Sequence, residues 1–135
     1  TQVLAMTGEN AGQRTYMTEN EQALILRDGM LAGTRGLGHD LSVAEMAQSS
    51  ALIRSGRSGQ VSRTMRYWTG DGLERPLKLE CNIGPGPKAG VMVENCQNGP
   101  LEIQNSYISQ GGRVTVSRQW IGPDLGYATI QELRP

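Results

Sequence analysis

The sequence predicts a mainly β protein, in which a single antiparallel meander sheet curls into a barrel or half-barrel and carries one short helix over about residues 42–55. Three observations support this fold class. The 135 residues include 18 glycines, many of them in tight-turn sequences. The segments between these turns alternate apolar and polar residues, which is the pattern of half-buried antiparallel strands. Only one segment has helical spacing, and a long twisted sheet curls on itself.

The length and charge of the chain limit its class. A chain of 135 residues suits one domain with a single core, so we assign residues 1–135 to a single β-rich domain. The 13 basic and 13 acidic residues balance. Nucleic-acid-binding proteins usually have a basic surplus, so we expect no nucleic-acid partner. No apolar run approaches the ~20 residues that cross a bilayer as a helix, so we expect no such helix.

Strands and hairpins are expected in the first third of the chain. Residues 3–6 and 15–18 suit two short strands that flank a polar, glycine-containing loop over residues 7–14. Asp28 and Gly29 lie between two apolar runs, and an Asp-Gly pair in that position is a strong signal for a hairpin.

The helix predicted over residues 42–55 has recognisable start and stop signals. Ser42 suits the N-cap position, and Glu45 three residues later would complete a capping box. Leu41 and Met46 match the hydrophobic staple that often accompanies such a box. Gly56 suits the left-handed position that follows a helix.

The middle of the chain alternates over residues 61–69 and 73–83, and residues 90–96 form the next strand. If the last two strands pair, Cys81 and Cys96 fall near opposite positions. Two alternatives follow: the cysteines are buried free thiols, or they form a disulfide, which export would favour. A disulfide would close a loop of about 16 residues and stabilise the fold by roughly 3 kcal/mol.

The C-terminal segment 105–123 reads N-S-Y-I-S-Q-G-G-R-V-T-V-S-R-Q-W-I-G-P and predicts a hairpin that turns at Gly111-Gly112. This segment resembles the C-terminal signature of the YjbF/GfcB family, the bacterial lipoproteins linked to group-four capsule and other exopolysaccharide secretion. Residues 23–41, A-L-I-L-R-D-G-M-L-A-G-T-R-G-L-G-H-D-L, resemble the N-terminal part of the same family. The resemblance implies a curved antiparallel sheet.

The resemblance also implies a location and a role. It implies a removed signal peptide and a lipid-bearing cysteine upstream of Thr1, and hence a periplasmic protein anchored to the outer membrane. The expected function is that of an exported, non-enzymatic accessory protein of exopolysaccharide or capsule assembly. Its partner would be the polysaccharide or an outer-membrane secretion protein. The alternative is a small-ligand or glycan-binding β-barrel module that is unrelated to capsule export.

No catalytic set is readable from the sequence. His39, the only histidine, lies in a glycine-rich bend and is expected to face solvent, while Asp40 suits a bond to a backbone amide. Glu80 and Glu94 fall on facing strands, but solvated carboxylates on strand faces are far commoner than glycosidase pairs. Two cysteines and one histidine do not suggest a metal site. We therefore expect no enzymatic activity, no metal and no cofactor.

Aromatic and arginine side chains are the best candidates for binding, because aromatic rings stack on sugars and arginine binds carboxylates. The alternative is that the tryptophans are core anchors, since a chain without phenylalanine needs them to fill volume. The candidate binding residues are Arg66, Trp68, Tyr107, Arg118 and Trp120.

Overall fold

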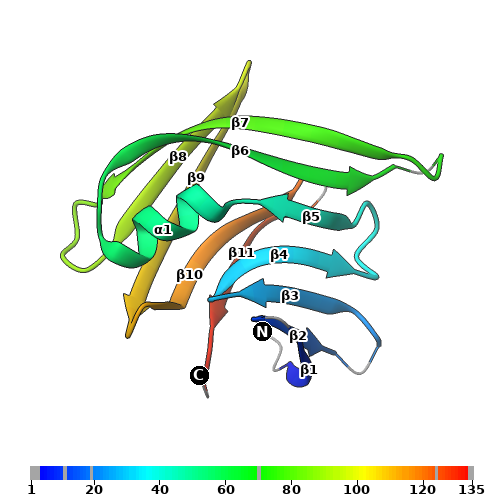
Figure 1. Cartoon of the computed structure of the whole chain (residues 1–135). Coiled ribbons are helices and arrows are strands. Elements are labelled where there is room, and N and C mark those ends of the chain that lie inside the picture. The colour runs from blue at the N-terminus through cyan, green and yellow to red at the C-terminus, as the bar shows by residue number, and fades with distance from the viewer. Residues whose placement is uncertain (1–3, 11, 19, 70, 124, 134–135) are drawn as a thin grey trace.

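The computed structural model describes residues 4–10, 12–18, 20–69, 71–123 and 125–133, which form eleven strands and one helix (Figure 1). The small N-terminal part contains β1 (Ala5–Asn10), β2 (Gln13–Met17), β3 (Ala23–Arg27) and β4 (Met30–Arg35). The remaining elements are β5 (Leu41–Glu45), α1 (Ala47–Ser55), β6 (Gly59–Trp68), β7 (Glu74–Pro85), β8 (Met92–Asn98), β9 (Leu101–Gln110), β10 (Arg113–Gly122) and β11 (Gly126–Gln131).

The strands form an antiparallel meander, and the predicted fold class is confirmed. Strands β1 to β4 make a four-stranded sheet, and β5 to β11 make a seven-stranded sheet that curves into a half-barrel (Figure 1). The meander was expected to be one continuous sheet, but no backbone ladder joins β4 to β5 in the part of the chain that the structure describes.

Side chains replace the missing ladder between β4 and β5. The backbone N–H groups of Gly36 and Leu37 donate to the Asp40 carboxylate at 2.8 and 2.9 Å, as expected for this bend. The Leu41 N–H donates to the Thr34 hydroxyl at 2.9 Å. These bonds satisfy backbone groups that a ladder would otherwise pair, so the two strands can separate beyond the bend.

The helix prediction was wrong in its first half. Residues 41–45 form β5, which pairs with β6 through Leu41↔Tyr67 and Ala44↔Met65. The helix begins at Ala47, and Met46 at the N-cap makes no side-chain cap, so the predicted capping box is absent. Burial of Leu41 and Ala44 against the large sheet outweighs the local capping signal. The stop signal was correct, because Gly56 adopts a left-handed conformation with φ 70°.

The hairpin turns are confirmed and the N-terminal loop is shorter than expected. Asp28 and Gly29 have φ of 53° and 85°, and Gly111 and Gly112 have φ of 60° and 77°. Strands β1 and β2 extend through most of residues 7–14, which were predicted to be a loop. Residue 3 of the predicted first strand lies outside the described residues.

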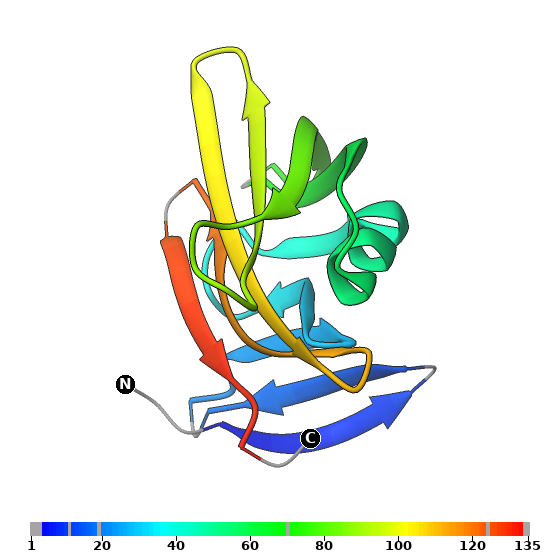
Figure 2. The ribbon, with the colours of Figure 1, turned by 90° about the vertical axis from the view of Figure 1, so that its left-hand side faces the viewer.

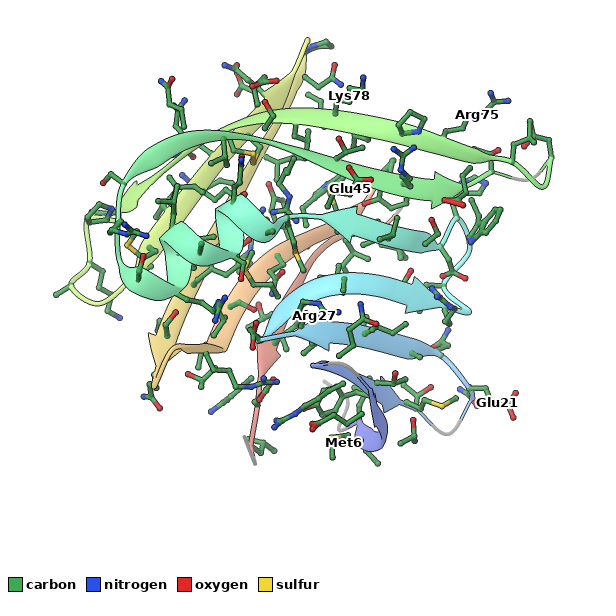
Figure 3. The ribbon with its side chains drawn as sticks, viewed as in Figure 1. Met6, Glu21, Arg27, Glu45, Arg75 and Lys78 are labelled. Carbon is green, nitrogen blue, oxygen red and sulfur yellow. A yellow bond between two sulfur atoms is a disulfide. The ribbon has the colours of Figure 1, made fainter. Side chains whose placement is uncertain are left out.

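The large sheet divides into two projecting hairpins. Strand β7 pairs with β6 over residues 74–83, but with β8 only over residues 80–85. The β8–β9 hairpin therefore separates from the β6–β7 hairpin and extends past the rest of the molecule (Figure 2). In Figure 3, Lys78 and Arg75 project from β7 away from the small sheet.

One cluster of buried apolar side chains joins both sheets and the helix. Its members include Leu26 and Leu31 from the small sheet, Ile53 from α1, and Leu79 and Ile103 from the large sheet. The concave face of the large sheet is thus filled by side chains. Most of the exposed side chains on the outer face of β6 to β9 are polar, and Trp68 and Ile108 are exposed apolar exceptions. No helix in the described ranges is long and apolar enough to cross a membrane.

Candidate functional site

A disulfide joins the centres of β7 and β8 on the inner face of the large sheet. Cys81 and Cys96 are directly opposite in the ladder, with Cα atoms 4.0 Å apart and an S–S distance of 2.02 Å. Both are buried at 3% exposure. The sequence left open free thiols or a disulfide, and the disulfide is confirmed.

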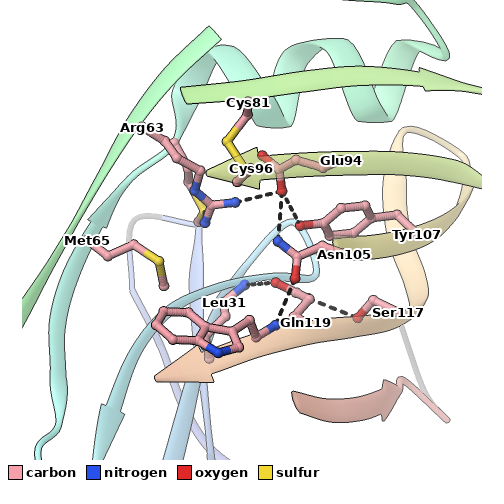
Figure 4. A network of polar contacts seen from close by, with 12 residues as sticks. Leu31, Arg63, Met65, Cys81, Glu94, Cys96, Asn105, Tyr107, Ser117 and Gln119 are labelled. Atoms are coloured by element: carbon pink, nitrogen blue, oxygen red, sulfur yellow. Dashed lines mark hydrogen bonds and ion pairs between the residues drawn. A yellow bond between two sulfur atoms is a disulfide. The ribbon is translucent and has the colours of Figure 1, made fainter. Parts of the chain in front are cut away.

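A buried carboxylate lies beside this disulfide (Figure 4). Glu94 on β8 is fully buried, and its Oε1 accepts hydrogen bonds from three side chains. The donors are Nη1 of Arg63 at 2.8 Å, Nδ2 of Asn105 at 3.0 Å and the hydroxyl of Tyr107 at 2.8 Å. Arg63 is itself only 4% exposed, so the pair is a buried ion pair with hydrogen-bonded support.

The surroundings keep this cluster in one protonation state. Burial alone would raise the pKa of Glu94, but the Arg63 charge and the hydrogen bonds from Asn105 and Tyr107 together hold that pKa below its usual value. Burial and the nearby Glu94 charge raise the pKa of Tyr107 well above its usual value. Glu94 therefore stays ionised and Tyr107 stays protonated around neutral pH, without access to solvent.

A second buried network ties the small sheet to β10 (Figure 4). The side chain of Gln119 accepts a hydrogen bond from the Leu31 N–H at 2.8 Å and donates to the Gly29 carbonyl at 3.0 Å. In addition, the Val114 N–H donates to the Asp28 carbonyl at 2.9 Å. The two segments that resemble the YjbF/GfcB family therefore meet here, and the Gln119 side chain and the Val114 backbone of the C-terminal segment are hydrogen-bonded to the β3–β4 hairpin.

The five predicted binding residues are not brought together. Tyr107 and Trp120 are buried at 1% and 8% exposure, and Trp120 packs edge-on against Tyr67 with ring centroids 6.3 Å apart. Both therefore lie inside the protein, where a ligand on the surface does not reach them. Trp68 is 43% exposed at the end of β6, with Arg66 two residues earlier on the same face.

Arg118, the fifth predicted residue, lies on another part of the surface. It is exposed, and its guanidinium carbon stands 3.9 Å from the centroid of the Tyr127 ring on β11. Such stacking holds the cation in place and leaves its edges available to solvent. A binding role for Arg66, Trp68 and Arg118 remains a prediction.

Glu80 and Glu94 do not form a glycosidase-like pair, in agreement with the expectation from the sequence. Glu80 is exposed on the outer face of β7 and accepts a hydrogen bond from the Ser62 hydroxyl at 2.7 Å, whereas Glu94 is buried on the inner face. Side chains on opposite faces of a sheet cannot converge on one glycosidic bond.

The outer face carries a row of exposed amide side chains that crosses four strands. Gln60 on β6 pairs with Asn82 on β7, Asn82 pairs with Asn95 on β8, and Asn95 pairs with Gln104 on β9. Directly paired residues point to the same side of an antiparallel sheet, so these four side chains are neighbours. We call Gln60, Asn82, Asn95 and Gln104 the amide row.

An open groove of about 430 Å³ includes most of this row. The groove is lined by Asn82, Asn95, Cys96, Gln97, Glu102, Ile103, Gln104 and Tyr127. At its end, β9 has separated from β10, and the Gln104 N–H donates to the Tyr127 hydroxyl at 3.0 Å instead of to a strand. Nε2 of Gln104 donates to Oδ1 of Asn95 at 2.9 Å, which fixes the orientation of both amides.

Comparison with known proteins now assigns the family. The family described as group 4 capsule polysaccharide lipoprotein gfcB, YjbF matches residues 1–133. The chain belongs to the YjbF family. The match covers nearly the whole sequence, so it includes the two segments that carried the resemblance and the strands between them.

A solved structure supports the fold of this YjbF family member. The crystal structure of the hypothetical lipoprotein YmcC from Escherichia coli (K12) aligns with a TM-score of 0.76 at 18% sequence identity. The alignment covers 98% of this chain and 76% of the YmcC chain. At this identity the likeness establishes the shared fold. No curated protein matches the sequence.

One group of metal-ligand types occurs among the described residues of this YjbF family member. Cys81, Glu94 and Cys96 place a sulfur, an oxygen and a sulfur within 4.8 Å of one another. Both sulfurs are joined in the disulfide, and Arg63 neutralises the carboxylate. The group therefore has no free thiolate to offer a metal.

Sequence reasoning missed the amide row. Each of its members occupies an outward position in an alternating strand. For Asn82, the alternation of the sequence predicted this outward position. The row becomes visible only when four strands are set in register, because neighbouring members of the row are separated by up to 22 positions along the chain. The register of β7 and β8 at the cysteines was the one available signal.

Proposed function

We propose that this YjbF family protein is an exported accessory protein of capsule or exopolysaccharide assembly or secretion, and that it acts by binding the polymer and not by catalysis. The groove that includes most of the amide row is the observation that carries this proposal. Asn and Gln side chains each offer donors and an acceptor, and sugar hydroxyls require both. The family description names a capsule polysaccharide lipoprotein.

The interior favours binding over catalysis. Perturbed ionisable groups often mark active sites, but they also occur in structural ion pairs. Here Glu94, Arg63 and Tyr107 form a hydrogen-bonded cluster under the sheet, out of contact with solvent. The concave side of the sheet is also filled by core side chains, which argues against a lipocalin-like ligand cavity.

The proposed location is the periplasmic side of the outer membrane, reached through a lipid anchor upstream of Thr1. The lipoprotein description of the family supports this location. The buried disulfide does too, because disulfides persist in oxidising compartments. Fractionation of cells that express the full-length gene tests it. Recovery of the protein in the cytoplasm, with the cysteines reduced, would contradict the proposal.

Direct binding to polymer tests the proposed role. Exopolysaccharide is purified from cells that carry the gene, immobilised on a biosensor and exposed to the protein. We expect saturable binding to the wild-type protein. The control variant Gln110→Ala leaves the amide row intact and should bind equally well, since this exposed amide lies at the far end of β9 from the row. Absence of binding to this polymer, with the protein shown to be folded, would contradict the proposal.

A second candidate is contact with a protein of the secretion machinery through the end of the β6–β7 hairpin. Trp68 and Leu73 are 43% and 52% exposed there, and exposed aromatic and aliphatic side chains are common anchors in protein interfaces. Crosslinking from position 73 in cells tests this candidate. This candidate predicts a crosslink to one specific protein, and the yield of that crosslink should fall in the Trp68→Ala variant. An unchanged yield would count against the candidate.

A further inference from the structure

We infer that the amide row is a subsite for an uncharged, hydroxyl-rich stretch of polysaccharide that lies across strands β6 to β9. This inference rests on the proposed polymer-binding function and adds to it the place of contact and the class of sugar. The row is defined by Gln60, Asn82, Asn95 and Gln104, which are all exposed.

The length of the row suits a chain ligand. Neighbouring strands lie about 4.8 Å apart, so four strands place the outer two members of the row roughly 14 Å apart. That span accommodates a few linked sugar rings. A ligand lying along the row crosses the strands, so each successive ring meets an amide from the next strand.

Some of the hydrogen-bond donors and acceptors of the row are used within the protein, and the others are available to a ligand. The bond from Gln104 to Asn95 uses one donor of Gln104 and one lone pair of Asn95. It leaves the Asn95 amino group as a donor and the Gln104 carbonyl as an acceptor, both in fixed orientation. Gln60 and Asn82 make no side-chain hydrogen bond within the described parts of the chain, so their full capacity faces solvent.

The charges around the row disfavour acidic sugars. The neighbouring row consists of Ser62, Glu80, Gln97 and Glu102, so two carboxylates flank the amides on one side. Lys78 lies beyond Glu80, one register step farther from the amide row. Arg118 lies past the end of the row and stacks on Tyr127. A uronic acid seated on the amides would meet Glu80 and Glu102 before it met either cation.

The composition of the row also disfavours a protein partner. Protein interfaces have an apolar core with aromatic or aliphatic anchors. The amide row contains no apolar side chain, and neither does the neighbouring row with Glu80 and Glu102. Neutral sugar hydroxyls are the ligand groups that match a surface of amides and hydroxyls without a cation.

The test uses an array of bacterial polysaccharides of known composition, some neutral and some containing uronic acids. The whole chain is applied as wild type, as the double variant Asn82→Ala/Asn95→Ala and as the control Gln110→Ala. We expect wild type and control to bind neutral members and the double variant to bind them at least tenfold more weakly. Equal melting temperatures of the three proteins establish that folding is not responsible.

The other outcomes contradict, in turn, the assignment to the amide row, the class of sugar and the polymer-binding function. Neutral binding that survives in the double variant overturns the assignment to the amide row. Binding confined to uronic-acid polymers overturns the sugar class but leaves polymer binding in place. Failure to bind any polymer on the array or the native exopolysaccharide overturns both the inference and the proposed function.

A reciprocal variant sharpens the charge argument. Replacing both flanking carboxylates, Glu80→Gln/Glu102→Gln, removes the repulsion without removing hydrogen-bonding capacity. We expect this variant to bind uronic-acid polymers several-fold better than wild type at low salt, with the gain reduced at high salt. Unchanged binding of acidic polymers would show that these carboxylates do not set the sugar class.

Discussion

The two faces of the same three strands use polar residues in opposite ways. On the inner face of β7 to β9, Glu94 and Asn105 are buried. Glu94 accepts hydrogen bonds from Arg63, Asn105 and Tyr107, and Asn105 accepts one from the backbone N–H of Trp120. On the outer face, the paired amides of the same strands are exposed. The residue types overlap, so composition does not distinguish a structural polar group from a binding group. The face of the sheet does.

The comparison also reassigns the residues of the C-terminal segment. Tyr107 was predicted to be a binding residue, but it is buried. Asn105 and Gln119 are buried as well, and all three are hydrogen-bonded to other elements. Changes on the inner face should therefore affect the free energy of unfolding, and changes on the outer face should affect binding. The following predictions test that division, starting with the largest effect.

Removal of the buried carboxylate should lower the free energy of unfolding more than any other change considered. Glu94→Ala leaves the Arg63 charge buried without its partner, and such a loss typically costs about 3–5 kcal/mol. Urea unfolding at pH 7 measures the effect. Glu80→Ala, on the opposite face, is the matched control and should change the free energy of unfolding by less than about 0.5 kcal/mol. Similar effects of the two changes would remove the distinction between the faces.

Loss of the disulfide should lower the free energy of unfolding somewhat less than Glu94→Ala does. Cys81 and Cys96 are 15 positions apart, and a cross-link of about that loop size stabilises a fold by roughly 3 kcal/mol through the unfolded state. Thermal unfolding with and without reductant measures it. In the double variant Cys81→Ala/Cys96→Ala, reductant should have no effect, and a remaining effect would mean that reduction acts elsewhere.

Gln119→Ala should destabilise the junction of the two sheets by about 2 kcal/mol, since it leaves buried backbone groups of Gly29 and Leu31 without partners. Gln131→Ala removes an exposed amide from β11 and is the control. Hydrogen exchange should show faster exchange of the Leu31 amide in the Gln119 variant. Unchanged protection of that amide would contradict the role assigned to Gln119.

Acid should lower the free energy of unfolding by protonating Glu94 on the inner face. Its pKa is lowered in the folded state, so its contribution to stability is complete above the unfolded-state pKa and is lost as pH falls through the folded-state pKa. One proton changes the free energy of unfolding by at most about 1.4 kcal/mol per pH unit. Between pH 5 and 2, Glu94→Gln should therefore show a shallower loss of stability than wild type. Parallel profiles would assign the acid sensitivity to other carboxyl groups.

The outer face should show the smallest effect on stability. Asn82→Ala/Asn95→Ala removes two exposed side chains, and such surface changes usually alter the free energy of unfolding by less than about 0.5 kcal/mol. Urea unfolding checks this value in the same protein samples used for polymer binding. A loss of more than about 1 kcal/mol would mean that the amides support the sheet itself.

Much of the fold is readable from local signals. The Asp28-Gly29 and Gly111-Gly112 turns, the alternation in β6 and β7, and the left-handed Gly56 depend on backbone sterics and on short-range periodicity. The placement of Cys81 opposite Cys96 follows once β7 and β8 are joined as neighbours. Each of these features involves residues that are close in sequence or adjacent strands.

The candidate site was readable only in part. Arg66, Trp68 and Arg118 were correctly expected on strands, but Tyr107 and Trp120 face the core. Strand β10 has register shifts between Val114 and Val116 and again between Trp120 and Gly122. These irregularities break the period of two, so simple alternation cannot assign the exposed face of this strand.

The sequence by itself determined the reversing strands and their tight turns, because these depend on dihedral preferences and on a period of two. It placed the two cysteines near opposite positions on neighbouring strands, but it left free thiols and a disulfide as alternatives. Only the tertiary structure decided that residues 41–45 form a strand, that Gln119 is hydrogen-bonded to the β3–β4 hairpin, and that Glu94 pairs with Arg63. The structure also decided that the two cysteines form a disulfide. The amide row was decided in the same way, by the register of four strands. Such features require contacts between distant residues, and the free energy of burying those residues together outweighs a local helix cap or the preference of a polar side chain for water.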